Sequence, residues 1–413
     1  MKVLNSKLKT LCFYLSLVTI IFFFPIIFLV FKFISIFLKI RITEILSNRY
    51  GHLALCPEYY LVNKRDGKIK EKFLDFFCES KYGVCNTELF KLWKEKIIIL
   101  PRCILGPIIF LFDKIYSRSK NPYTINNFNQ TAQNLKFIWD KYEPSIKLSF
   151  DQIKKCKSIL LNNGIDIDRE KFVCLFNRDD VYLSSLPRKK NWYYLSHHNY
   201  NIDKFNLLAK ELSERNIYLF RMGVKAKGTF GITNPKIIDY ANSNFRCELL
   251  DIFLAARCYF GISCGTGSSG VAYLYRKPML DLNANLHHLT TWVHTGVMLA
   301  KHYYSKDKNR NLTLEELMKF NFGDLDQRQQ LDNYNIEMID CTDKEIKDAC
   351  IELLYRIEGV WKDTNDDMEL QSLFRKKFDV FKKHKKTNLR WHGNVIRSFY
   401  SSDFLRNNKS WLN

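Results

Sequence analysis

Between residues 172 and 282 the sequence alternates short apolar runs with amphipathic stretches, and this pattern constrains the fold more than any other feature. The apolar runs are of the kind found in buried strands, and the stretches between them place apolar side chains on one helical face. The predicted strands are Phe172–Phe176, Ile217–Arg221, Tyr259–Ile262 and Lys277–Leu282, and the predicted helices are 203–212 and Glu248–Ala256. Strands and helices that alternate in this way form a parallel, doubly wound sheet.

A chain of 413 residues is too long for one ordinary hydrophobic core, so two domains are expected. We predict an N-terminal α/β domain over residues 45–165 and a C-terminal one over 166–345. Helices in 346–413 are expected to pack back on the N-terminal domain. Within the N-terminal domain the predicted elements are a turn at Arg49–Leu55, a strand at Glu58–Val62, a helix at Leu89–Pro101, a loop at Asn121–Asn134 and a helix at Lys154–Leu161 that stops at Asn162–Gly164.

The first 44 residues are predicted to attach the chain to a membrane. Leu11–Phe31 contains no charged residue and is long enough to cross a bilayer core of roughly 30 Å. Lysines precede and follow this run, which leaves its orientation open. Because Pro25 kinks a helix, a single span and a re-entrant hairpin with both ends in the cytoplasm are both compatible with the sequence.

Charge and cysteine content narrow the classes of partner and compartment. The formal net charge is +21, which indicates either a polyanionic partner, such as anionic lipid or a phosphorylated substrate, or a solvated lysine-rich surface. No nucleic-acid-binding motif is present, so nucleic acid is not expected as a partner. The twelve cysteines lack the paired spacing of metal sites, which favours reduced thiols and a cytosolic compartment.

The stretch Ser263–Gly270 is the strongest local signal for chemistry. A predicted strand runs into glycine and serine residues that open a helix, which is a geometry that suits a phosphate or pyrophosphate. The candidate donor-binding residues in it are Ser263, Gly265, Thr266, Gly267, Ser268 and Ser269. The alternative is that small residues merely permit tight packing between strand and helix.

Two arginines lie at the carboxyl ends of predicted strands. Arg178 comes after the first strand of the C-terminal domain, and Arg221 ends the second. In an open α/β sheet the ligand crevice lies at the carboxyl ends of the strands, so both guanidinium groups are candidates for binding a diphosphate. The alternative is surface ion pairing, with Arg178 meeting Asp179 or Asp180.

The remaining candidates rest on single residues. Glu248 and Asp251 either stabilise the dipole of their helix or accept a hydrogen bond from a ribose or base. Asp239 and Tyr240 are candidates for contacting a base, although Tyr240 also suits a core. His52 is a candidate catalytic base. No metal site is predicted, because the pairs His197–His198 and His287–His288 diverge on strands and helices and have no fixed acidic partner.

Several of these stretches together resemble a family of bacterial glycosyltransferases associated with surface-polysaccharide loci. The resemblance covers roughly residues 45–320. It rests on Asn48–Leu55 with Glu58–Leu61, Leu92–Lys94, Phe172–Asp179, Arg221–Gly223, Asp239–Tyr240, Asp251 and Ser263–Gly270. Cys264 stands in the small-residue loop where the family leads one to expect serine, so this side chain is not expected to bind phosphate itself.

The resemblance implies a GT-B fold, with two Rossmann-like doubly wound domains that face each other across a cleft. It implies an acceptor site in residues 45–165 and a nucleotide-sugar site in 166–345, with no metal or other cofactor. The expected enzyme transfers a sugar to a lipid-linked or surface-glycan acceptor at the cytoplasmic side of the inner membrane. The alternatives are a non-catalytic membrane-anchored scaffold of a polysaccharide assembly complex and an α/β transferase of pyruvyl or phosphosugar groups.

Overall fold

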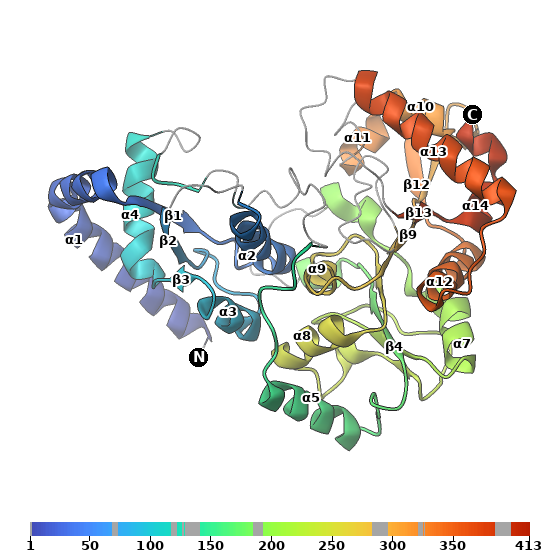
Figure 1. Cartoon of the computed structure of the whole chain (residues 1–413), viewed down its shortest axis with the longest axis horizontal. Coiled ribbons are helices and arrows are strands. Elements are labelled where there is room, and N and C mark those ends of the chain that lie inside the picture. Colours follow the sequence, from blue (N-terminus) through green and yellow to red (C-terminus); the bar gives the residue numbers. More distant parts are fainter. Residues whose placement is uncertain are drawn as a thin grey trace. The chain divides into compact units, whose positions relative to one another are not determined.

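The computed structural model describes residues 2–67, 73–116, 122–125, 128, 141–184, 193–282, 296–320, 325, 327–384 and 398–413 (Figure 1). The chain forms two compact units. Unit 1 contains residues 1–131 and 144–147, and unit 2 contains residues 132–143 and 148–413. The change of unit therefore comes earlier than the predicted boundary at residue 165.

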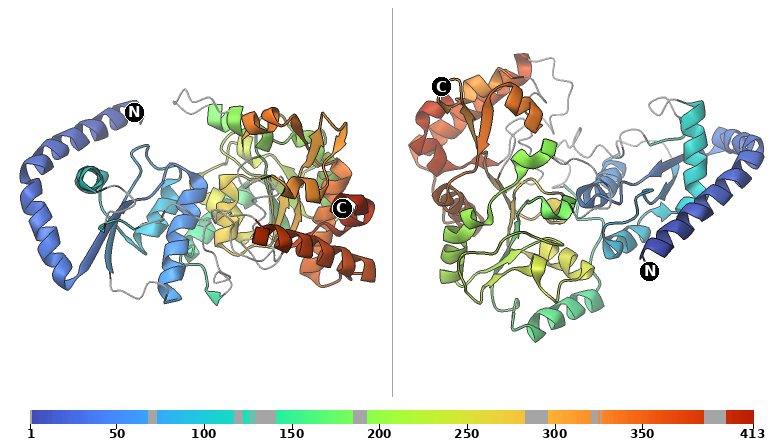
Figure 2. Two further views of the ribbon diagram at one scale, coloured as in Figure 1. Left: turned by 90° about the horizontal axis from the view of Figure 1, so that it is seen from above. Right: turned by 180° about the vertical axis from the view of Figure 1, so that it is seen from behind.

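Unit 1 is a three-layer structure around a small parallel sheet. Its strands lie in the order β1 (Lys39–Glu44), β2 (Phe73–Cys78) and β3 (Ile98–Ile99). Its helices are α1 (Lys2–Phe37), α2 (Tyr50–Arg65), α3 (Thr87–Lys94) and α4 (Arg102–Ile115). Helices α1 and α4 pack together on one face of the sheet, and α2 and α3 lie on the other (Figures 1 and 2).

Helix α2 corrects two predictions in unit 1. The turn at Arg49–Leu55 and the strand at Glu58–Val62 are both wrong, because residues 50–65 form one helix. The strand was predicted wrongly because the periodicity of a short apolar run does not distinguish a strand from a buried helical segment. In α2 the carboxylate of Glu58 is fully buried and accepts a hydrogen bond from the Ser145 backbone N–H at 3.0 Å. The strands described in unit 1 follow one another in sequence order and so lack the reversal of a doubly wound sheet.

Helix α1 is bent where the sequence predicts a kink. No single helix among the residues described is long and apolar enough to cross a membrane. The segments Tyr14–Phe23 and Pro25–Ile34 meet that test of length and composition only as a pair, and they are bent by 70° relative to each other. Proline removes a backbone hydrogen bond and clashes with the preceding turn, which explains a bend at Pro25.

Unit 2 is built on a seven-stranded parallel sheet, which confirms the predicted parallel α/β architecture. The strand order is β13-β9-β8-β7-β4-β5-β6. Their bounds are β4 (Phe172–Phe176), β5 (Tyr218–Arg221), β6 (Ile237–Ile238), β7 (Gly261–Ser263), β8 (Met279–Leu282), β9 (Gly296–Leu299) and β13 (Phe399–Tyr400). The first strand of unit 2 in sequence is β4; β5 and β6 follow on one side of it, and the chain then returns to place β7 on the other side, as in a doubly wound sheet.

Helices cover the sheet, and a small antiparallel sheet completes unit 2. The helices are α5 (Phe150–Asn162), α6 (Val181–Ser184), α7 (Asn206–Glu214), α8 (Glu248–Arg257), α9 (Gly270–Leu274), α10 (Leu314–Met318), α11 (Arg328–Asn333), α12 (Asp343–Glu358), α13 (Asn365–His384) and α14 (Ser402–Asn407). The antiparallel strands are β10 (His302–Ser305), β11 (Arg310–Asn311) and β12 (Ile336–Ile339). The predicted stop of α5 is confirmed, since Gly164 follows it with a left-handed φ of 75°.

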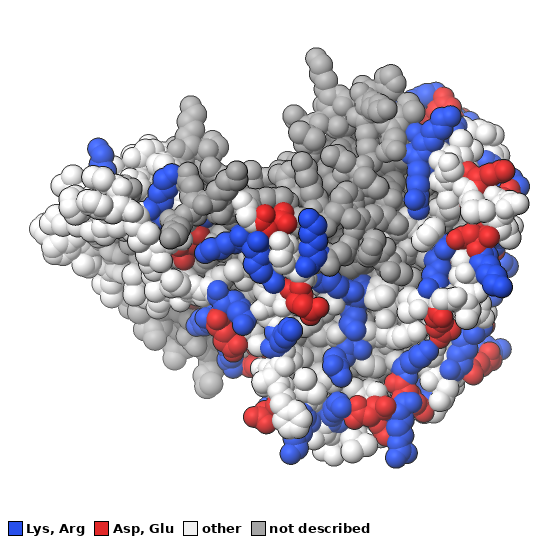
Figure 3. All heavy atoms as spheres, in the orientation of Figure 1, with Lys and Arg blue, Asp and Glu red and all other residues white. Residues whose placement is uncertain are grey.

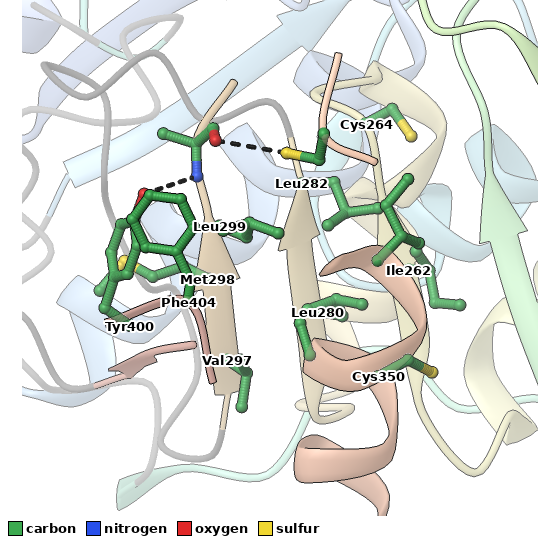
Figure 4. Packing of buried hydrophobic residues seen from close by; sticks show 14 of the residues in the cluster. Ile262, Cys264, Leu280, Leu282, Val297, Met298, Leu299, Cys350, Tyr400 and Phe404 are labelled. Atoms are coloured by element: carbon green, nitrogen blue, oxygen red, sulfur yellow. Dashed lines mark hydrogen bonds between the residues drawn. The ribbon is translucent and has the colours of Figure 1, made fainter. Parts of the chain in front are cut away.

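The core of unit 2 lies between the sheet and α12. Side chains from β7, β8 and β9, among them Ile262, Leu280 and Leu299, belong to one buried cluster with Cys350 of α12 (Figure 4). All four are fully buried. The sequences of these strands are continuous apolar runs because helices cover both faces of the parallel sheet.

The C-terminal helices form part of unit 2, whereas they were expected to pack on the N-terminal domain. β13 pairs with β9, and the Gln371 side chain of α13 bonds the Tyr400 backbone at both its N–H and its carbonyl. The buried Glu352 carboxylate of α12 accepts the backbone N–H of Ser402 at 2.7 Å. These polar contacts inside an apolar core hold residues 398–413 at the edge of the sheet.

Candidate functional site

The candidate site lies where the winding of the sheet in unit 2 reverses, between β4 and β7. These two strands are neighbours, with Phe176 paired to Ser263 at their carboxyl ends. The residues that follow them therefore lie side by side, and the Arg178 Nη1 donates a hydrogen bond to the Gly265 carbonyl at 3.0 Å. Ligands of doubly wound folds bind at this kind of switch point, so Arg178 and the glycine-rich loop occupy a binding position together.

Arg178 carries a charge without a carboxylate partner in its described surroundings. No Asp or Glu oxygen among the described residues lies within ion-pairing distance of its guanidinium, so the predicted alternative of pairing with Asp179 or Asp180 is not formed there. Partial burial lowers the pKa of Arg178, but a guanidinium remains charged at any physiological pH. An unpaired cation at a strand end suits an anionic ligand.

The glycine-rich loop divides into exposed and buried parts. Gly265 has a φ of 69°, which favours glycine, and Gly265 and Gly267 are exposed while Thr266 and Ser268 are half-buried. The Ser263 hydroxyl instead donates to Ser269 at 2.9 Å, and both side chains are buried. Residues 265–268 can therefore contact a ligand, whereas the buried hydrogen bond between Ser263 and Ser269 stabilises the conformation of the loop.

The helix after this loop is short. A 3₁₀ turn at Gly267–Ser269 leads into α9, which has only five residues. Because the dipole of so short a helix is small, the backbone N–H groups of loop residues 265–268 are the better candidate anion donors. Cys264 points into the core beside Ile262 (Figure 4), and burial raises the pKa of its thiol. This agrees with the expectation that Cys264 does not contact phosphate.

Arg221 is a correction to the predicted site. Its side chain is 0% exposed, and its Nη1 and Nη2 donate to the carbonyls of Gly228 at 2.7 Å and Lys227 at 2.5 Å. The carboxylates of Asp179 and Asp239 lie 3.5 and 3.7 Å from the guanidinium. Arg221 therefore neutralises two acids and fixes the 223–228 loop, and it has no exposed surface with which to bind a diphosphate.

The candidates near β6 and α8 form a second buried network. Tyr240 is fully buried and its hydroxyl donates to Asp251 at 2.9 Å, so it cannot stack on a base in this structure. Asp251 also pairs with Arg246 at 2.5 Å, and burial raises its pKa to about 6. The carboxylate of Asp239 pairs with the buried guanidinium of Arg221. Glu248 lies half-buried in the first turn of α8, where it complements the helix dipole.

The histidine candidates fall in three places. His52 lies half-buried in α2 of unit 1, with its Nδ1 3.5 Å from the Cys56 Sγ, and its role as a base stays a prediction. The rings of His197 and His198 lie 4.0 Å apart. His287 and His288 fall outside the residues described, and within those residues no group of three or more His, Cys, Asp or Glu side chains could hold a metal ion.

The structure adds two residues that sequence analysis did not single out. Asn177 precedes Arg178, and its buried Oδ1 accepts no hydrogen bond from the residues described. Lys301, just after β9, is buried and bonds the carbonyls of His197 and Asn199 and the carboxylate of Asp340. The position of each, one or two residues past a strand end, is the sequence signal that could have identified it.

Asp281 gives the site a pH-dependent group. It lies at the end of β8 opposite Ser263, where it accepts a hydrogen bond from the Tyr273 hydroxyl. Burial raises the pKa of Asp281 to about 7, against the lowering effect of that bond. Because the folded state then holds a proton that the unfolded state releases, this residue's contribution to stability is present at low pH and is lost as pH rises from about 4 to about 7.

Replacing Asp281 with asparagine should remove that pH dependence. In urea unfolding at pH 5 and pH 7.5, we expect wild type to lose more stability than Asp281→Asn as pH rises, by up to about 1.4 kcal/mol per pH unit within this window. Asp203→Asn, at an exposed residue before α7, is the matched control. Equal pH dependence in wild type and Asp281→Asn would show that the Asp281 pKa is not raised.

Comparison with known proteins gives only distant structural likeness. No protein-family model and no curated protein matches the chain. A family 9 glycosyl transferase from Veillonella parvula aligns with 77% of this chain and 97% of its own at 8% identity and a TM-score of 0.40. ADP-heptose lps heptosyltransferase II from E. coli aligns with 77% and 100% at 11% identity and a TM-score of 0.40.

A third solved structure is similarly distant. The dodecameric iron-containing heptosyltransferase TibC, solved in complex with ADP-D-beta-D-heptose, aligns with 78% of each chain at 11% identity and a TM-score of 0.37. Likeness at these TM-scores establishes neither a shared fold nor a shared activity. The site is therefore defined by this chain's own geometry, a parallel sheet with an unpaired arginine and a glycine-rich loop at its switch point.

Proposed function

We propose that the chain is a glycosyltransferase that moves a sugar from a nucleotide-diphosphate sugar to a lipid-linked or surface-glycan acceptor. The observation that carries this proposal is the contact between Arg178 and Gly265 at the switch point of a doubly wound sheet. It places a guanidinium without a described carboxylate partner beside the backbone of a partly exposed glycine-rich loop, and the two together suit a diphosphate. The sequence resemblance to bacterial glycosyltransferases supports the choice of a sugar donor.

In the proposed reaction, an acceptor hydroxyl oxygen bonds to the anomeric carbon of the donor sugar. The bond between that carbon and the diphosphate oxygen breaks, and its electron pair leaves with the nucleoside diphosphate. Arg178 and the N–H groups of residues 265–268 stabilise the negative charge that develops on this leaving group. The acceptor proton passes to a base, for which we propose His52. No metal or other cofactor takes part in the proposed step.

We also propose that the enzyme works at the cytoplasmic face of the inner membrane. Lipid-linked acceptors are presented there, and the net charge of +21 favours an anionic surface. The scaffold and the pyruvyl or phosphosugar transferase stay the competing functions, because either is compatible with a parallel α/β sheet.

A ligand screen tests the proposal directly. The full-length protein in detergent is heated with UDP-, GDP-, CMP-, dTDP- and ADP-sugars, with NAD, ATP and phosphoenolpyruvate for comparison. We expect one nucleotide-sugar to raise Tm selectively, by an amount that grows with its concentration. A cooperative melt that no ligand shifts would favour the scaffold, and a shift by phosphoenolpyruvate alone would favour pyruvyl transfer.

A further inference from the structure

One face of helix α1 packs against the rest of unit 1, and the other face exposes large apolar side chains. On the inner face, Phe28 and Phe31 lie 6.0 and 5.5 Å from the ring of Phe112 in α4. The outer residues are between 47% and 80% exposed: Tyr14, Leu15, Val18, Ile21, Phe22, Phe23, Ile26, Leu29, Val30, Phe33, Ile36 and Phe37. A surface helix whose outer face contacts water usually carries polar residues on that face.

Helix α4 extends this apolar surface. Leu105 and Phe112 point into unit 1 and are buried, while Ile104, Phe110 and Ile115 are about half exposed. Since α1 and α4 pack against each other on the same face of the sheet (Figure 2), their exposed side chains belong to one layer. Contiguous apolar patches of this kind mark an interaction site.

The charges around this surface are almost all positive. No Asp or Glu occurs in residues 1–43, and Asp113 is the one acid within α4. Lys32, Lys39 and Lys114 are exposed at or beside the two helices. In Figure 3 the described part of the surface over α1 shows few charged side chains, whereas charges of both signs crowd other parts of the view. Apolar side chains with a few exposed lysines among them match the interface of an anionic bilayer.

The shape of α1 decides how it meets a bilayer. Each of its two apolar segments has ten residues and is therefore only about 15 Å long, half of a bilayer core. They are bent by 70°, and the second segment is held to α4 through Phe28 and Phe31. A segment fixed along the protein surface in this way lies in the interface more readily than across it.

We propose that the outer face of α1 and the exposed residues of α4 form one membrane-binding surface that lies in the plane of an anionic bilayer. The partner is the lipid bilayer itself, and α4 contributes to binding as well as α1. This inference does not depend on the proposed transferase activity, since it concerns only how the protein is held at the membrane.

Vesicle flotation of the full-length chain tests the role of α4. Wild type and Phe110→Asp/Ile115→Asp are reconstituted from detergent with phosphatidylcholine vesicles that contain or lack phosphatidylglycerol. We expect the double variant to bind the anionic vesicles ~10-fold more weakly than wild type, because it exchanges two interfacial apolar side chains for charges that anionic lipid repels. Leu161→Asp/Val360→Asp changes two similarly exposed apolar residues of unit 2 and should bind like wild type.

Two results would overturn the proposal. If Phe110→Asp/Ile115→Asp binds as tightly as wild type, α4 is not part of the surface and α1 anchors the chain alone. If wild type resists extraction by alkaline carbonate, α1 crosses the bilayer and does not lie in its plane. Ile104→Asp serves as the second α4 variant if the double variant does not melt cooperatively. Because the readout is membrane binding, it is independent of any failure in the ligand screen.

Discussion

Replacing Arg221 with alanine is expected to lower the free energy of unfolding by about 3–5 kcal/mol. The guanidinium is fully buried, bonds two backbone carbonyls and lies between Asp179 and Asp239. Its removal leaves two carboxylates that repel each other and two carbonyls without their donor. Deleting one member of such a charge cluster costs more than the cluster contributes, since Asp179 and Asp239, which are 16% and 25% exposed, are left without this counter-ion.

Urea unfolding of purified variants measures this effect. Arg169→Ala is the matched control, because Arg169 is largely exposed and pairs with Asp166 at 3.4 Å, an arrangement that contributes at most about 1 kcal/mol. We expect Arg221→Ala to shift the urea midpoint far more than Arg169→Ala. A similar small shift in both variants would contradict the structural role assigned to Arg221.

Replacing Arg178 with alanine is expected to reduce kcat/KM by about 10²–10³-fold with the donor that the ligand screen identifies. Arg178 lies at the switch point and has no carboxylate partner among the residues described, so its charge is available to the leaving diphosphate. Stability should change by less than about 1 kcal/mol, because one hydrogen bond to Gly265 is lost from a partly exposed side chain. Arg178→Lys should retain part of the activity, since it keeps the charge and loses the planar fork.

Steady-state transfer assays and urea unfolding of the same preparations separate the two effects. Arg169→Ala again provides the control, with unchanged kcat/KM expected. Unaltered turnover in a folded Arg178→Ala protein would remove this residue from the site. A loss of turnover that matched a loss of stability would instead assign Arg178 the kind of structural role described for Arg221.

The sheet of unit 2 was predictable because its signals are local. Phe172–Phe176 is a strand with the predicted bounds, and α8 begins at Glu248 as predicted. Both follow from apolar runs and helical periodicity that need no knowledge of distant residues. The same holds for Gly164, whose lack of a side chain suits the left-handed turn after α5.

The difference between Arg178 and Arg221 was not predictable, because it depends on residues brought together by the fold. Both follow or end a strand, yet only Arg221 is enclosed by the 223–228 loop and by Asp239. The helix α2 was missed for a related reason. Its buried Glu58 accepts a hydrogen bond from the backbone of Ser145, which lies 87 residues further along the chain.

The position of β13 has a consequence for how the protein is made. The Tyr400 hydroxyl accepts the backbone N–H of Ala300, a contact between residues 100 apart in sequence. At a synthesis rate of about 5–20 residues per second, the ribosome delivers this part of the sheet roughly 5–20 seconds after β9. During that interval β9 is an open edge on the nascent chain, a template for pairing with other polypeptides. We therefore expect ribosome-stalled chains that end before residue 398 to be cleaved rapidly by protease within unit 2 and to recruit chaperones.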